Sequence, residues 1–75
     1  MKRIFYIKDD GGEFVRIVIE PYKDPEEPGI SKFRITSKPF SGTLDKNENG
    51  DINPPQQSNL FDHISFLIRK YYQDF

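Results

Sequence analysis

The 75-residue sequence contains no cysteine and a single histidine, His63. Without cysteine the chain has no disulfide, no thiolate nucleophile and no zinc–thiolate site, which fits a cytoplasmic protein. His63 lacks a catalytic partner at a workable spacing, because Asp62 and Ser65 are too close in sequence to share its face of a helix. No glycine-rich phosphate loop is present either. We therefore expect a non-catalytic protein that uses no cofactor.

Long apolar runs and an excess of one charge are also absent. Hydrophobic residues make up 35% of the chain, mean hydropathy is −0.74, and no stretch approaches the length of a transmembrane helix. Residues 4–7 form an apolar run too short for the hydrophobic region of a signal peptide. Eleven basic and twelve acidic residues leave a net charge of −1. That balance opposes electrostatic attachment to nucleic acid or an anionic membrane, and we expect no membrane contact.

Aromatic residues are the main source of apolar surface in the sequence. Seven Phe and four Tyr can bury much apolar surface, and a disordered chain would rarely carry so many. The length fits one domain, and the chain shows neither an internal repeat nor a domain linker. We expect residues 1–75 to fold as a single small domain.

The first half of the chain has the patterns of antiparallel strands. Two β-prone runs, residues 4–7 and 14–19, flank an Asp-Asp-Gly-Gly turn and predict a hairpin. Pro21 is expected to end the second strand. Residues 30–36 alternate between apolar and polar and predict a third strand with one buried face. After a break at Pro39, residues 40–44 are compatible with a short fourth strand, whereas residues 45–57 are expected to be irregular.

From Asn59 onward the apolar spacing changes to that of an amphipathic helix. Ser58 or Asn59 is the expected N-cap, and the helix is expected to run to the chain end. The residues that share the apolar face are Leu60, Ile64, Leu67, Ile68, Tyr71 and Phe75, flanked by Phe61 and Tyr72. The sequence thus predicts an α+β fold: a three- or four-stranded antiparallel sheet with one C-terminal amphipathic helix packed on one face.

One polar segment resembles the calcium loop of EF-hands and dockerins. Asp45, Asn47 and Asn49 match its first, third and fifth positions, Gly50 and Ile52 match the turn and the following aliphatic residue, and Asp51 would contribute its carbonyl. Gln56 replaces the bidentate carboxylate, and prolines stand where a helix should begin. The resemblance implies a weak calcium site at Asp45, Asn47, Asn49 and Asp51. The alternative is a polar connection built around an Asn-Gly turn.

The side of the sheet away from the helix is the expected binding surface. If Ile17, Ile19, Phe33 and Ile35 face the helix, the residues that face away are Phe14, Arg16, Val18, Lys32 and Arg34, together with either Ile4 and Tyr6 or Phe5 and Ile7. This mixture suits a protein interface, a homodimer contact or a stacking platform for single-stranded nucleic acid. The remaining alternative is that residues 40–55 fold back and cover it.

Phe66 is the exceptional residue of the predicted helix, because its position falls on the polar side near His63, Arg69 and Lys70. It is either an aromatic anchor for a partner or a singly exposed side chain. Taken together, the sequence predicts a small accessory protein that acts through protein–protein contact, for example as an inhibitor or adaptor. A nucleic-acid-binding module and a weak calcium-binding module are the two alternatives.

Overall fold

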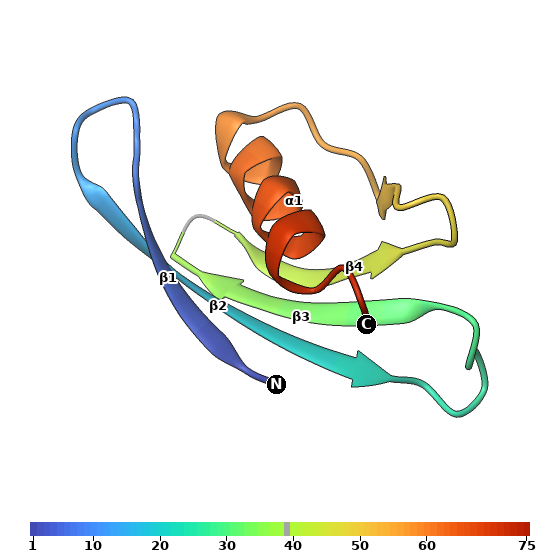
Figure 1. The fold of residues 1–75 in the computed structure, drawn as a ribbon. Helices are drawn as coiled ribbons and strands as arrows, with labels where there is room; N and C mark the ends of the chain where they lie inside the picture. Colours follow the sequence, from blue (N-terminus) through green and yellow to red (C-terminus); the bar gives the residue numbers. More distant parts are fainter. Residues whose placement is uncertain (39) are drawn as a thin grey trace.

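The computed structural model describes residues 1–38 and 40–75, which form a five-stranded antiparallel sheet and one helix (Figure 1). The strands follow one another in chain order across the sheet: β1 (Arg3–Lys8), β2 (Phe14–Lys23), β3 (Ser31–Ser37), β4 (Ser41–Lys46) and β5 (Ile52–Asn53). The predicted α+β class is confirmed. The predicted number of three or four strands is wrong, because β5 adds a fifth. The expected break at Pro39 lies outside the described residues.

The predicted hairpin of β1 and β2 is confirmed. Its register runs from Arg3 opposite Ile19 to Lys8 opposite Phe14. One oxygen of the Asp9 carboxylate accepts from the backbone N–H groups of Gly11 and Glu13, both at 2.9 Å, and so holds the turn. The hairpin end projects beyond the other strands (Figure 1).

Strand β2 does not end at Pro21, as the sequence had suggested, but continues to Lys23. Pro21 pairs with Phe33 of β3, whereas pairing with β1 stops at Ile19. Beyond Ile19 the strand is therefore an edge on the β1 side, and proline is tolerated at edges because no ladder hydrogen bond is lost there.

The segment expected to be irregular, residues 45–57, contains the end of β4 and all of β5. A tight turn between these strands explains the difference. The side-chain oxygen of Asn47 accepts from the N–H groups of Asn49 (2.9 Å) and Asp51 (3.0 Å), and Gly50 adopts a positive φ of 85°. The turn reverses the chain and brings Ile52 back into the core.

The helix α1 spans Asn59–Tyr71, and Ser58 is its N-cap, accepting from the N–H of Phe61 at 3.0 Å. The expectation that the helix runs to the chain end is wrong. After Tyr71 the chain turns, so that the Phe75 ring packs edge-on against Phe33, with 5.5 Å between ring centroids. The gain in buried aromatic surface explains why the last residues leave the helix.

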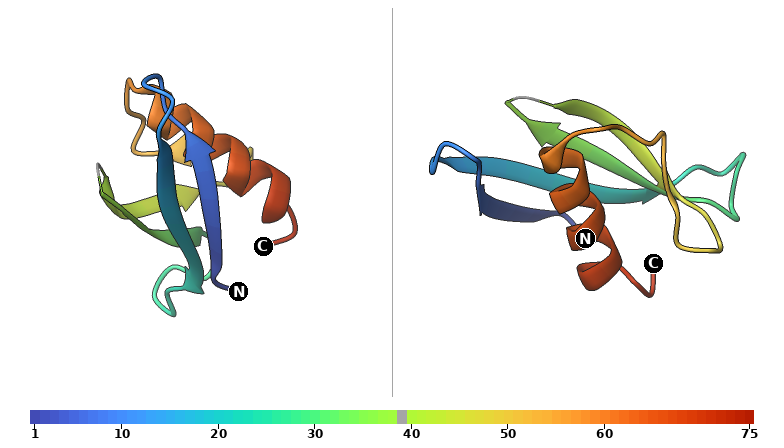
Figure 2. Two further views of the ribbon diagram at one scale, coloured as in Figure 1. Left: turned by 90° about the vertical axis from the view of Figure 1, so that its left-hand side faces the viewer. Right: turned by 90° about the horizontal axis from the view of Figure 1, so that it is seen from above.

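The helix lies against one face of the twisted sheet (Figure 2). The buried core between the two layers comprises Ile17, Ile19, Phe33, Ile35, Leu44 and Ile52 of the sheet with Ile64, Ile68 and Tyr72. Phe5 and Ile7 pack against this core, so Ile4 and Tyr6 are the pair that faces away. None of the described helices is long and apolar enough to cross a membrane.

Candidate protein-binding surface

The outer face of the β1–β2 hairpin carries three large apolar side chains in an exposed group. The register sets Ile4 opposite Val18, Tyr6 opposite Arg16 and Lys8 opposite Phe14, all on the side away from the helix. Exposure is 48% for Ile4, 63% for Tyr6 and 70% for Phe14. Ile4, Tyr6, Phe14 and Arg16 are called the hairpin patch below. Large apolar residues gathered in this way are uncommon on a surface with no partner.

Two cations flank the apolar part of the hairpin patch. The Lys8 ammonium lies 5.6 Å from the centroid of the Phe14 ring. Arg16 is exposed and forms no ion pair with any described residue. At the hairpin tip, Asp9 is occupied by backbone N–H groups and Asp10 accepts from the Asn59 side chain at 2.9 Å. The patch therefore combines exposed apolar side chains with two cations that form no ion pair with any described residue.

Val18, another predicted contact residue, lies between Ile4 and Thr36 in the register and is only 9% exposed. Its cross-strand neighbours cover it. Val18 therefore lies beneath the neighbouring side chains of the outer face, and a partner would contact those side chains rather than Val18.

Lys32 reaches the outer face from β3, but acidic residues of the β2–β3 loop already surround it. Its ammonium lies 2.9 Å from Glu27 and 3.8 Å from Asp24. The hydrogen bond to Glu27 is the main reason that the pKa of Lys32 is raised. A partner would have to compete with these carboxylates for Lys32.

Arg34, two residues further along β3, also has interaction partners within the molecule. Its guanidinium lies 2.9 Å from a carboxylate oxygen of Glu20 and 4.7 Å from the centroid of the Tyr22 ring. The predicted outer face thus divides into two parts. Lys32 and Arg34 have partners within the molecule, whereas Phe14 and Arg16 stand free at the hairpin end.

The segment suggested as a cover for the outer face lies elsewhere. Leu44 and Ile52 are buried in the core on the helix side, and Phe40 packs against that core. An open hollow of about 840 Å³ borders the hairpin patch where β2 extends past β3. Its lining includes Phe14, Arg16 and Lys38, together with the acidic residues Asp9 and Glu13. The hairpin patch is thus continuous with a shallow depression.

Phe66, the candidate anchor on the helix, is 59% exposed. Its ring lies 5.7 Å from the Lys70 ammonium. Because the helix covers the opposite face of the sheet, Phe66 and the hairpin patch are separate surfaces.

The four predicted calcium ligands are distributed between a strand and a turn. Asp45 lies in β4, opposite Lys32 and Asn53. The side-chain oxygen of Asn47 already accepts two backbone N–H groups of the turn, those of Asn49 and Asp51. Within the described part of the chain, no group of three or more His, Cys, Asp or Glu could hold a metal ion. Calcium binding stays a prediction.

Lys46 has a role that the sequence pattern did not suggest. It shares the inward face of β4 with Leu44, and only 9% of its surface is exposed. Its ammonium donates to the main-chain oxygen of Tyr72 at 2.6 Å. Burial is the main cause of a lowered pKa for Lys46, and nearby Lys23 lowers it further, whereas Asp74 raises it. The inward alternation of Leu44 and Lys46 was the only signal in the sequence for this position.

Comparisons of the chain with protein-family models, curated proteins and solved structures give no significant match.

Proposed function

We propose that this protein is a non-catalytic accessory protein of the cytoplasm, and that it binds another protein through the hairpin patch. The observation that carries the proposal is the joint exposure of Ile4, Tyr6 and Phe14 on one face of a projecting hairpin. Burying such side chains contributes roughly 1.5–3 kcal/mol each. A partner that covers all three would gain a substantial part of the free energy of binding, although lost translational and rotational freedom and side-chain ordering offset some of that gain.

The charges around the hairpin patch favour one class of partner. Lys8 and Arg16 flank the apolar centre, and among the described residues neither forms an ion pair. A complementary partner surface has an apolar centre with acidic residues at its rim. Nucleic acid is a weaker candidate, because Lys32 and Arg34 are already paired with acidic residues and the net charge is −1.

A site-specific photo-crosslinker at position 14 identifies the partner in the native host. The purified partner is then titrated into the protein by calorimetry. The double variant Phe14→Ser/Arg16→Glu should weaken binding by at least about tenfold, because it removes a buried ring and reverses a rim charge. Its thermal unfolding midpoint should match that of the original chain, since both side chains are exposed.

Phe66→Ser is the matched control, because it is the same change at a phenylalanine of similar exposure on the opposite side of the molecule. It should leave the affinity unchanged. If Phe66→Ser abolishes binding and the hairpin variant binds normally, the contact surface is the helix and the proposal is wrong. Unfolding of the hairpin variant would show that Phe14 and Arg16 stabilise the fold rather than bind a partner.

A further inference from the structure

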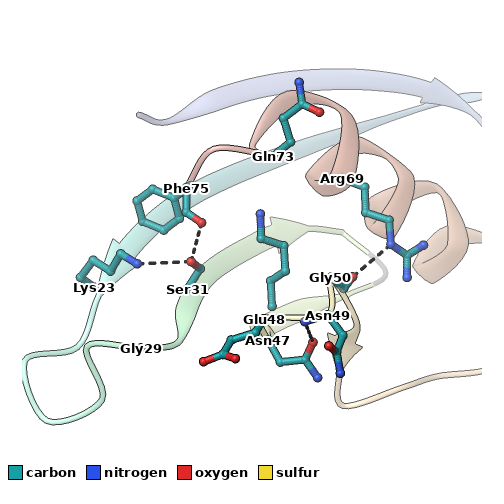
Figure 3. A pocket seen from close by; sticks show the side chains of 11 residues that line it. Lys23, Gly29, Ser31, Asn47, Glu48, Asn49, Gly50, Arg69, Gln73 and Phe75 are labelled. Carbon is teal, nitrogen blue, oxygen red and sulfur yellow. Dashed lines mark hydrogen bonds between the residues drawn. The ribbon is translucent and has the colours of Figure 1, made fainter.

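A second surface, on the helix side, has a chemistry of its own. The β2–β3 loop, the β4–β5 turn and the residues that follow α1 enclose a hollow of about 420 Å³ (Figure 3). Three cationic side chains from separate segments line it: Lys23 of β2, Lys46 of β4 and Arg69 of α1. Glu48 is the acidic side chain of the lining, and Asp74 is near enough to act on Lys46.

The three cations make hydrogen bonds only to neutral groups in the described part of the chain. Lys23 donates to the Ser31 hydroxyl at 3.3 Å, and Arg69 donates through Nε to the main-chain oxygen of Gly50 at 3.2 Å (Figure 3). Lys46 donates to the main-chain oxygen of Tyr72. No described carboxylate forms an ion pair with any of the three. An ammonium carries three N–H donors and a guanidinium five, so most of their donors remain available.

Lys46 is an unfavourable feature of the protein without a ligand, because its charged side chain is buried. A buried charge is unfavourable unless an opposite charge or several hydrogen bonds compensate for it. Burial lowers the pKa of Lys46, Asp74 offsets part of this effect, and repulsion by the second ammonium, that of Lys23, lowers the pKa further. An anion in the hollow would add negative charge beside cations that form no ion pair with a described carboxylate.

We propose that this hollow binds the phosphate groups of a small phosphorylated molecule. The volume lies in the range of small-molecule sites. Lys and Arg side chains are the usual ligands of phosphate, Lys as a compact charge and Arg as a planar fork. Ser31 and Phe75 line the same hollow, and the Ser31 hydroxyl, which donates to the main-chain oxygen of Phe75 at 2.7 Å, helps to hold Lys23 in place. This site is distinct from the hairpin patch and does not depend on the proposed protein contact.

Pyrophosphate is the probe, titrated by calorimetry and followed by backbone amide NMR in a buffer of low ionic strength. We expect a dissociation constant of about 1 mM or tighter, as for a small ligand held by a few charged contacts. The amide shifts should concentrate in residues 46–50 and around Ser31 and Arg69. Inorganic phosphate should bind more weakly, and acetate, with a single negative charge, more weakly still.

The double variant Lys23→Ala/Arg69→Ala should weaken pyrophosphate binding by about tenfold or more. The side chains of Lys23 and Arg69 are exposed, so the double variant should retain the fold. The variant Lys46→Met tests the buried cation, but it also removes the hydrogen bond to the main-chain oxygen of Tyr72. Lys70→Ala is the control for the Arg69→Ala half of this variant, because it removes one positive charge from the same helix outside the hollow. Equal weakening by Lys70→Ala, or no binding at about 10 mM pyrophosphate, would overturn the site.

Discussion

At the scale of single residues, the core includes Ile64 and Ile68 of the predicted apolar stripe, but its centre is displaced toward the Tyr72 side of that stripe. Ile64 and Ile68 are 1% and 0% exposed, whereas Leu67 is only half-buried and Tyr71 is 42% exposed. Helical periodicity identified the apolar side but not its centre, because it does not specify how the helix is rotated on the sheet. Tyr72, next to the stripe, is the side chain that becomes buried.

This rotation gives a residue-level prediction. Ile68→Ala should lower the free energy of unfolding by roughly 3 kcal/mol, because it leaves a cavity in a fully enclosed site. Leu67→Ala, one position away, should cost only about 1 kcal/mol, because solvent already reaches part of that side chain. Urea denaturation followed by circular dichroism measures both. Equal losses for the two variants would mean that the helix is rotated differently on the sheet.

At the scale of elements, the hairpin and the third strand could be predicted because their signals are local. Alternation in β3 correctly separates Phe33 and Ile35 from Lys32 and Arg34. Strand β5 could not be predicted in this way, since it has two residues and depends on pairing Ile52 with Lys46 across a turn. The grouping of the three cations around the hollow could not be predicted from the sequence, because they come from three remote segments that only the tertiary fold brings together.

The β4–β5 turn gives a prediction at the element scale. Gly50 has a φ of +85°, a region that residues with a Cβ rarely adopt. Gly50→Ala should therefore lower the unfolding free energy by about 1 kcal/mol through backbone strain, since an added Cβ would meet no atom within 4 Å.

Gly29→Ala is the control for this turn. A Cβ at Gly29 also meets no atom within 4 Å, but its φ lies outside the left-handed region. Chemical denaturation should show no loss, or a small gain, for this variant. A Gly50→Ala protein as stable as Gly29→Ala would contradict the positive φ of the turn.

At the scale of the whole molecule, the distribution of charge matters more than the net charge of −1. Acidic residues of the β2–β3 loop neutralise Lys32, and Glu20 neutralises Arg34. Five of the cations without carboxylate partners in the described chain lie toward the two ends of the fold: Lys8 and Arg16 at the hairpin patch, and Lys23, Lys46 and Arg69 around the hollow beside α1. The two proposed ligands therefore bind opposite regions, and both can occupy the protein at once.

The same charges predict the oligomeric state. Strand β1 is an edge strand, paired with β2 alone, so its free side is a potential site for pairing with a second copy. Each copy would bring Lys2, Arg3 and Lys8 to that seam, and contact between two hairpin patches would bring Lys8 and Arg16 together. Like charges at such close range oppose association. We therefore expect a monomer of 8.8 kDa by sedimentation velocity at about 100 μM, the concentration range where weak dimers become populated. A dimer that Phe14→Ser/Arg16→Glu converts to monomer would instead make a second copy of this chain the occupant of the hairpin patch.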